Sequence, residues 1–444
     1  MTALSSFPHQ SRESHVVAAV GTYALCLFVF PSDLVLRVVG GQGFVASLVA
    51  LGLLGGWGLS VLLGLHNPLL VRHPTRGVVG LWAVTSLACW AMTPFHGLSG
   101  TQQLSADRWI MLIASSAGVV LVAAEGLETR EALLSVLRLA VLGAAFCSLV
   151  AVLQWVLTLD LSGIIRQSLP GFEVNSTYSV YQPRGALTRV TGTTLHPIEL
   201  GVVAGMMMPL ALALAIQDRS RGAWRRWGPV ALIGLSVPAS VSRSAVLSVL
   251  VALVVFVVLL PARTRASAVV FLPVGALLLV LARPGYIRTL ATFIGAGSDD
   301  LSVSSRLDDY PMVQKMVAEH PWLGTGGGTF MPLDALDILD NQYLKGAVEL
   351  GVIGLTGVVA WLVIPVVTAL HARHRSADPT LRLVAAALAG AACANAVSSA
   401  TFDSLSFNMF AGLHALVVGC IGACWIQSGR QPPPVPDPSP PNRS

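Results

Sequence analysis

Long apolar runs recur along the whole chain, and short polar segments separate them. A run of about twenty apolar residues is long enough to cross a bilayer. A backbone in lipid must satisfy its hydrogen bonds within the segment, and the alternating pattern of a barrel strand is absent, so the runs predict helices. We expect an all-α polytopic membrane protein with about twelve transmembrane helices. The predicted spans lie near residues 16–31, 44–65, 77–93, 109–124, 133–158, 196–216, 227–241, 244–260, 267–282, 343–370, 381–398 and 407–427.

The composition supports this class. Hydrophobic residues make up 54% of the 444 residues and charged residues only 11%, whereas a soluble domain carries about 25% charged residues. The mean hydropathy is +0.72. These values exclude a soluble enzyme, a secreted disulfide scaffold and a nucleic-acid binder, although the net charge is +5. All six cysteines fall inside apolar runs, so we expect no disulfide and no metal role for them. We also expect no cofactor.

Basic residues in short loops predict the orientation, because such loops stay in the cytoplasm. We expect both termini to be cytoplasmic and the chain to lie in the cytoplasmic membrane of a bacterium. The high arginine and low lysine content indicates a GC-rich bacterial genome. The arginines concerned lie in alternate connections, on the same side as Arg12 and Arg430: Arg72, Arg76, Arg219, Arg221, Arg225, Arg226, Arg263, Arg265, Arg373, Arg375 and Arg382.

The chain divides into three parts. Residues 1–15 form an expected cytoplasmic N-terminus, residues 16–427 form the transmembrane domain, and the Pro-rich tail at 428–444 is expected to be disordered. Within the domain, the glycine pairs Gly52/Gly56 and Gly201/Gly205 have the spacing of close helix packing.

Two long loops, at about 160–195 and 283–342, fall on the extracytoplasmic side. Long ordered loops are usually functional. The second loop contains an amphipathic stretch that predicts a helix from about Ser305 to Glu319, ended by His320, Pro321 and the glycines that follow. The GTGGGTF run at 324–330 lacks the preceding strand and the lysine of a nucleotide-binding loop. We interpret this run as flexible backbone near a site.

Arg243 stands out because it lies in a tight connection between two apolar spans, in the sequence PASVSRSAVLS. A charge at the rim of a helix bundle is costly unless it is paired or faces water. The stretch from Pro238 to Ser248 contains no carboxylate, which leaves a distant acidic group or a bound anion as the partner. Guanidinium groups bind phosphate oxygens bidentately, so clustered arginines suit a diphosphate.

The segment YQPRGALTRVTGTTLHPIELG supplies Arg184 and Arg189 and then His196 and Glu199 as the sixth span begins. Pro197 favours the first turn of a helix, which places His196 at the membrane surface and Glu199 one turn in. Glu199 either complements the helix dipole or helps to orient a sugar or an arginine. His196 either occupies the interface or shares that binding role.

The segment DALDILDNQYLKGAVELGVIGL leads from the second long loop into the tenth span. Asp340 and Asn341 stand where a helix N-cap is expected, and Tyr343 lies just inside. Asp340 is therefore either a cap or a general base that activates an acceptor hydroxyl. Glu349 lies deeper and is either a partner for a basic residue or a second candidate base.

Taken in order, the segments RVTGTTLHPIELG, SVSRSAVLS, SSRLDDYPMVQKMVAEHPWLGTGGGTF and LDNQYLKGAVELGVIGL resemble the O-antigen ligase and polysaccharide polymerase family. The resemblance covers residues 184–360 in detail and the whole chain in topology. It implies a glycosyltransferase of the GT-C type that acts in cell-envelope or exopolysaccharide biosynthesis. Such an enzyme takes a glycan from a polyprenyl (undecaprenyl) diphosphate carrier on the extracytoplasmic side, without a nucleotide sugar or a metal ion.

The resemblance also implies roles for individual residues. Arg243 and Arg189 match arginines that would hold the departing diphosphate, and Arg306 matches the arginine that opens the large-loop helix. Asp340 stands before Asn341 where many ligases have a histidine proposed as the base. This difference leaves the base open, because an aspartate needs a raised pKa to accept a hydroxyl proton efficiently.

Two alternatives remain open. The acceptor is either another lipid-linked repeat, as in a polymerase, or a different glycan or lipid, as in a ligase. A secondary transporter or flippase also has about twelve helices, but it is expected to show repeat symmetry between its halves. The polar features of this chain lie instead in the two outer loops.

Overall fold

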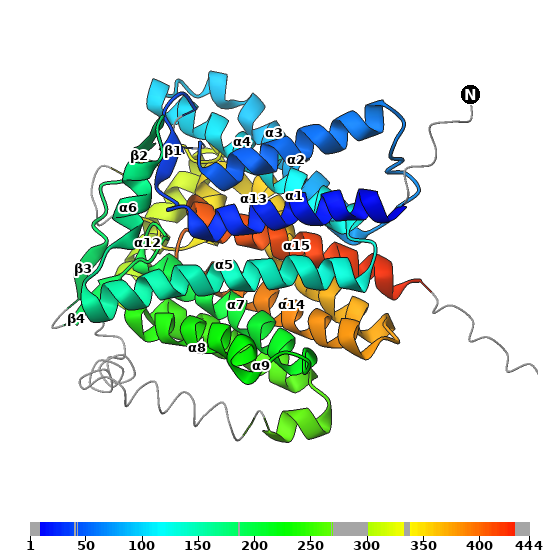
Figure 1. Cartoon of the computed structure of the whole chain (residues 1–444). Coiled ribbons are helices and arrows are strands. Elements are labelled where there is room, and N and C mark those ends of the chain that lie inside the picture. The colour runs from blue at the N-terminus through cyan, green and yellow to red at the C-terminus, as the bar shows by residue number, and fades with distance from the viewer. Residues whose placement is uncertain are drawn as a thin grey trace, which may run out of the picture.

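A computed structural model describes residues 9–39, 41, 43–184, 187–267, 269, 301–332 and 338–430, without the side chains of 9–11 and 301–309. Within the described residues, a helix covers each predicted span (Figure 1). The predicted span near 267–282 and the tail from 431 onward lie outside the described residues, so the total of twelve spans stays a prediction. The helices at the predicted spans are α1 (His9–Val29), α2 (Val45–Leu62), α3 (Pro74–Ala91), α4 (Gly100–Gly126), α5 (Arg130–Leu157), α7 (Pro197–Gln217), α8 (Ala223–Ser240), α9 (Arg243–Leu259), α13 (Gln342–Arg375), α14 (Pro379–Ser398) and α15 (Asn408–Ser428).

Eight of the described helices are long and apolar enough to cross a membrane, by length and composition. Their burial separates the centre of the bundle from its rim. In the most apolar window of each helix, 89% of α7 and 83% of α15 is buried, against 17% of α2. An apolar helix that remains largely uncovered suits a face in contact with lipid. The chain is thus an all-α polytopic membrane protein in its architecture, with α7 and α15 at the centre.

Small residues bring the central helices together. Gly201 lies against Ala245 and Ser240, and Gly205 lies against Ser248, so that α7 packs closely on α9. The spacing of Gly201 and Gly205 predicted this contact correctly. The same prediction was wrong for Gly52 and Gly56, because among the described residues nothing lies within 4 Å of a β-carbon placed at either position. Spacing identifies a smooth helix face, but it does not say whether another helix covers that face.

The first long loop contains the short strands β2 (Phe172–Val174), β3 (Tyr181–Arg184) and β4 (Leu187–Val190), and β1 (Leu34–Leu36) lies in the connection after α1; the sequence pattern did not predict these strands. Strand β1 pairs with β2, and β3 forms a hairpin with β4; both pairings are antiparallel. Strands of three or four residues are too short to show a period of two in the sequence. The short helix α6 (Leu161–Ser168) precedes β2 in the loop.

Arg166 fastens this loop to the bundle. Its guanidinium donates through Nε to both carboxylate oxygens of Asp33 at 3.1 Å, and Nη2 lies 3.0 Å from one of them. Asp33 is buried in the turn that follows α1, and Asp160 Oδ2 lies 3.8 Å from Arg166 Nη1. One of the basic residues in the two long loops is therefore explained by a structural ion pair.

The second long loop forms α12 (Leu301–Glu319), which ends at the residue predicted, and then inserts into a break in α13. Gly351 has φ +60°, and there the backbone N–H groups of Val352 and Ile353 donate to the carbonyls of Pro321 and Trp322 at 2.9 and 3.0 Å. Much of the GTGGGTF run is buried, partly against Glu349 beside this break and partly against α4. Our interpretation of the run as flexible backbone was therefore wrong, because tertiary contacts hold it in place.

The two ends of the bundle differ in character (Figure 1). We call the end at which α7, α9, α13 and α15 begin the loop end, since the strands, α6 and α12 lie there. We call the opposite end, where α1 begins and α15 ends, the terminal end. Arginines of the short connections make cross-links there: Arg130 to Asp378 at 3.1 Å, Arg373 to the Leu259 carbonyl, and Arg430 to the Glu128 carbonyl at 2.9 Å.

Candidate functional site

Four helix N-termini meet at the loop end, and polar side chains complete each of them. The Nδ1 atom of His196 accepts from the Ile198 N–H at 3.2 Å at the start of α7, and Ser242 caps α9 through the Ala245 N–H at 3.4 Å. Asn341 caps α13, and the carboxylate of Glu199 accepts from the first backbone N–H groups of α15. Helix N-termini carry partial positive charge, so this end favours anions.

Helices α7 and α9 run parallel, and their packing places Arg243 beside the first turn of α7. Gly201 lies against Ala245, and the Ser248 hydroxyl donates to the Val202 carbonyl at 3.1 Å. Arg243, two residues before Ala245, therefore lies level with Glu199 in the first turn of α7. The tight connection predicted from the sequence is present, since α8 ends at Ser240 and Val241 has φ +44°.

The β3–β4 hairpin brings two further arginines to the same place. Arg184 Nη1 donates to the Val241 carbonyl at 3.0 Å, which lies two residues from Arg243. Arg189 stands opposite Gln182 in the hairpin, and its Nε is buried with no hydrogen-bond partner among the described residues. Burial lowers the pKa of Arg189, and the nearby charge of Arg184 lowers it further. Two cations held close together, one with an unsatisfied donor, favour a bound anion.

His196 lies beside these arginines and is neutral at physiological pH. Burial lowers its pKa to about 4, and the charges of Arg189 and Arg184 contribute in the same direction. Since Nδ1 accepts from a backbone N–H, the neutral ring carries its proton on Nε2 and remains a hydrogen-bond donor there. The Tyr178 ring packs edge-on against the imidazole ring, with 5.3 Å between their centroids. The centroid of the Phe407 ring, in the residue that precedes α15, lies 6.2 Å from that of the imidazole.

The start of α13 lies across the segment from Ser399 to Phe407. Asp340 is exposed just before the cap, and the Asn341 side chain accepts from the N–H of Tyr343 at 2.9 Å. Gln342 donates its N–H to the carbonyls of Ser399 and Phe402 and accepts from the Leu405 N–H at 2.8 Å. Because this same segment ends at Phe407 beside His196, it connects the arginines to the start of α13.

Tyr343 and Lys345 fix the first turn of α13. The Tyr343 hydroxyl donates to the Ala396 carbonyl at 2.7 Å. Lys345 Nζ lies 3.2 Å from Asp403 and 2.9 Å from the Ser406 hydroxyl. Lys345 is thus a second basic residue of this end that a structural ion pair explains.

The two buried glutamates hold backbone segments. Glu199 and Glu349 are each 0% exposed. Glu199 accepts from the N–H groups of Leu195, Met409 and Phe410 at 2.8 to 3.0 Å, which joins α7 to α15. Glu349 accepts from Gly328 at 2.9 Å and from Phe330 at 3.2 Å, which holds the glycine run against α13.

The predicted site residues thus fall into distinct groups. Arg184, Arg189, His196 and Arg243 come together, and Asp340, Asn341 and Tyr343 lie at the start of α13. Arg306 belongs to α12, but its side chain lies outside the described residues. Sequence reasoning missed Tyr178 and Phe407, whose only signal was their aromatic character near the interface. It also missed the ion pair of Lys345 with Asp403, because the two residues are far apart in the chain.

Among the described residues, no group of three His, Cys, Asp or Glu side chains is placed to hold a metal ion. The described groups at the loop end include arginine donors, helix N-termini and a carboxylate. Arginine donors and helix N-termini are suited to an anion, and Asp340 is an exposed carboxylate at the start of α13.

The fold and the site define a polytopic helical membrane protein with a group of arginines at one end of its bundle. Residues 228–359 match the family model for O-antigen ligase. This match supports a relationship of the chain to the O-antigen ligase family. The matched segment contains Arg243, Arg306, Asp340 and Glu349, whereas Arg184, Arg189 and His196 precede it. A comparison with curated proteins gave no match.

Proposed function

We propose that this protein is a membrane glycosyltransferase of the O-antigen ligase type. It transfers a glycan from a polyprenyl-diphosphate carrier to an acceptor hydroxyl on the extracytoplasmic face. The observation that carries the proposal is the meeting of Arg184, Arg189 and Arg243 at the loop end, with the buried Nε of Arg189 lacking a hydrogen-bond partner among the described residues. The match of residues 228–359 to the O-antigen ligase family model supports the reaction type.

In the proposed reaction, the oxygen of the acceptor hydroxyl attacks the anomeric carbon of the glycan. The bond between that carbon and the diphosphate oxygen breaks, and its electron pair leaves with the polyprenyl diphosphate. The hydroxyl proton passes to Asp340. Arg189 and Arg243 stabilise the negative charge that develops on the leaving group, and the N-termini of α7 and α9 add to the same field.

The two buried glutamates are poor alternatives to Asp340 as the base. Their carboxylate oxygens accept backbone N–H groups, and neither side chain is exposed. A base must come within hydrogen-bond reach of the hydroxyl that it deprotonates. Asp340 is exposed, and it precedes the cap of α13 at the mouth of the bundle. His196 is a poor base for another reason, since its free ring nitrogen carries the proton.

The acceptor defines two versions of the function. A ligase attaches the glycan to a different molecule, whereas a polymerase attaches it to a second lipid-linked repeat. The residues described serve either version, because both use the same donor. Identification of the product decides between them.

The test uses the full-length protein in proteoliposomes that contain a polyprenyl-diphosphate glycan and a candidate acceptor. The expected result is release of free polyprenyl diphosphate together with a new glycosidic product. A longer lipid-linked glycan identifies a polymerase, and a glycan on the added acceptor identifies a ligase. Movement of the intact lipid-linked glycan across the bilayer without any release of polyprenyl diphosphate would overturn the proposal in favour of a flippase.

A further inference from the structure

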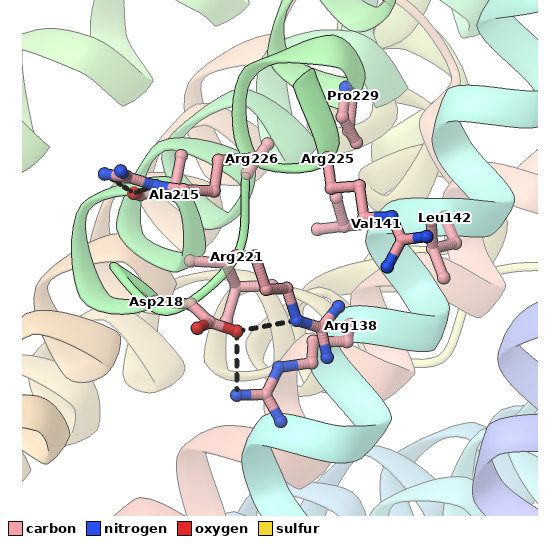
Figure 2. Close-up of a pocket in the computed structure, with 11 residues that line it drawn as sticks. Arg138, Val141, Leu142, Ala215, Asp218, Arg221, Arg225, Arg226 and Pro229 are labelled. Atoms are coloured by element: carbon pink, nitrogen blue, oxygen red, sulfur yellow. Dashed lines mark hydrogen bonds and ion pairs between the residues drawn. The ribbon is translucent and has the colours of Figure 1, made fainter. Parts of the chain in front are cut away.

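A basic hollow lies at the terminal end of the bundle, away from the proposed catalytic site (Figure 2). It is enclosed by α5, the end of α7 and the start of α8, and it contains about 420 Å³ of empty space, its open mouth included. Helix α7 has 21 residues, so the hollow lies about 30 Å from His196 at 1.5 Å per residue. Four arginines and one aspartate line it: Arg138, Arg221, Arg225, Arg226 and Asp218.

Asp218 holds two of these arginines in place. Its carboxylate lies 2.9 Å from Arg221 Nε and 3.6 Å from Arg138 Nη2, and Figure 2 shows it between the two guanidinium groups. The Ser220 hydroxyl and both arginines lower the pKa of Asp218, so the carboxylate is charged at neutral pH. Each guanidinium keeps further N–H donors that this carboxylate does not use.

The other two arginines differ from each other. Arg226 donates through Nε and Nη2 to the Ala215 carbonyl at 2.9 and 2.7 Å, and so caps the end of α7. Arg225 makes no hydrogen bond or ion pair with any residue that the structure describes. Its guanidinium extends toward α5, where Val141 and Leu142 line the wall (Figure 2). The hollow therefore carries three more positive charges than negative ones, and one of its cations has no acceptor among the described residues.

The walls below the arginines are apolar. Val141, Leu142, Leu214 and Pro229 form them. Leu142 is 52% exposed, and Leu149 and Val156 continue the exposed apolar stripe along α5 at intervals of seven residues. An uncovered apolar stripe on a spanning helix faces lipid chains.

Two tryptophans mark the membrane surface beside the hollow. Trp224 and Trp227, in the first turns of α8, are 87% and 43% exposed. Exposed tryptophans beside arginines at the end of a spanning helix are typical of the level of the lipid headgroups. The mouth of the hollow thus lies at the depth where phosphate groups of the bilayer are found.

We propose that this hollow is a binding site for an anionic glycerophospholipid of the surrounding leaflet. The lipid phosphate accepts hydrogen bonds from Arg225 and from the free donors of Arg138 and Arg221, and one acyl chain lies along Leu142 and Leu149. An anionic lipid fits better than a free cytosolic anion, because the apolar walls and the exposed stripe continue directly from the basic mouth into the membrane. The site is independent of the proposed glycosyl transfer.

The test titrates the purified full-length protein in detergent with dioleoyl-phosphatidylglycerol and measures bound lipid by native mass spectrometry. The expected result is saturable binding that is at least about tenfold tighter than binding of dioleoyl-phosphatidylcholine. Arg225→Ala is expected to weaken phosphatidylglycerol binding by about tenfold, since a charge-assisted hydrogen bond to phosphate is lost. Leu142→Trp fills the apolar wall without changing the charge and is expected to weaken it as well.

Arg382→Ala is the matched control. Arg382 is exposed at the start of α14, at the same end of the molecule, and it does not line the hollow. This variant is expected to bind phosphatidylglycerol as the wild type does. Equal losses in Arg225→Ala and Arg382→Ala would overturn the proposal, because they would indicate nonspecific attraction to the basic end. Failure of inorganic phosphate to displace the bound lipid would support the proposal. If phosphate competes with the lipid and Leu142→Trp leaves the lipid affinity unchanged, the hollow is a site for a free anion instead.

Discussion

Partial burial keeps His196 uncharged at neutral pH. The folded protein therefore resists protonation of this histidine, and its stability depends on pH. Its pKa falls from 6.5 to about 4 in the folded protein. A histidine whose folded pKa is lowered disfavours protonation of the native state, so it costs stability as the pH falls below about 6.5. We predict that the wild type loses thermal stability between pH 7 and pH 4.5 and that His196→Asn loses less over the same range.

The measurement is the unfolding temperature of both proteins in the same detergent at each pH. The asparagine variant keeps a side-chain oxygen that can cap α7. Parallel pH curves for the two proteins would contradict the neutral, partly buried state of His196.

Asp340 supplies the second prediction at the level of the single residue. Asp340→Asn keeps the size of the side chain and removes its ability to accept a proton. General-base catalysis contributes about 10² to 10⁴ in rate, so glycan transfer should fall at least about 100-fold, mainly in kcat. Glu173→Gln is the control, because Glu173 is an exposed carboxylate at the same end that pairs with Arg37. Full transfer by Asp340→Asn would assign the proton acceptor to another group.

At the level of the element, the break in helix α13 at Gly351 and the ordered conformation of the glycine run at 324–330 stabilise each other. A β-carbon at Gly351 would meet the backbone of Trp322 and Leu323, and φ there is +60°. Gly351→Ala should therefore lower the free energy of unfolding by about 1 to 3 kcal/mol and release the glycine run from α13. Gly52→Ala is the matched control: it lies within α2 with open space around it, and alanine there is expected to be neutral or stabilising by up to about 1 kcal/mol.

Thermal unfolding and proteolysis near Gly326 measure the two consequences together. Equal stability of Gly351→Ala and the wild type would mean that the break in α13 does not depend on the glycine. Increased cleavage in the Gly52→Ala variant would also contradict this assignment, because that residue is remote from the glycine run.

The same elements show what the sequence could and could not predict. Helix positions followed from hydropathy, and the cap at Asn341 and the proline after His196 fixed two helix starts, because these signals are local. The glycine run was misjudged because its order comes from Glu349 and from Pro321 and Trp322 at the break, which only the folded chain brings together. Local signals singled out Arg243 and Arg189. The sequence did not indicate that Arg184 would bond to Val241 beside Arg243, or that Arg138 would join Asp218 in the basic hollow.

At the scale of the whole molecule, the distribution of arginines between the two ends of the bundle predicts how the protein is oriented in the membrane. Most arginines of the short connections lie at the terminal end, which is expected to be cytoplasmic. In intact cells, a membrane-impermeant maleimide should label Thr177→Cys at the loop end and should not label Ser220→Cys at the terminal end until the cells are opened. Both positions are exposed. The reverse pattern would place the arginine site on the cytoplasmic side and would exclude an extracytoplasmic reaction.

The proposed transfer depends on the arginines of the loop end, and Arg243→Ala tests it most directly. The measurement is the rate at which polyprenyl diphosphate is released from a lipid-linked glycan in proteoliposomes, with matched amounts of inserted protein. We predict a fall of at least about 100-fold, since one donor to a developing anion contributes about 10² to 10³ in rate. Arg37→Ala, which removes an exposed arginine paired with Glu173 at the same end, should release polyprenyl diphosphate at the wild-type rate. Full transfer by a normally inserted Arg243→Ala protein would contradict the assignment of this end as the site of diphosphate departure.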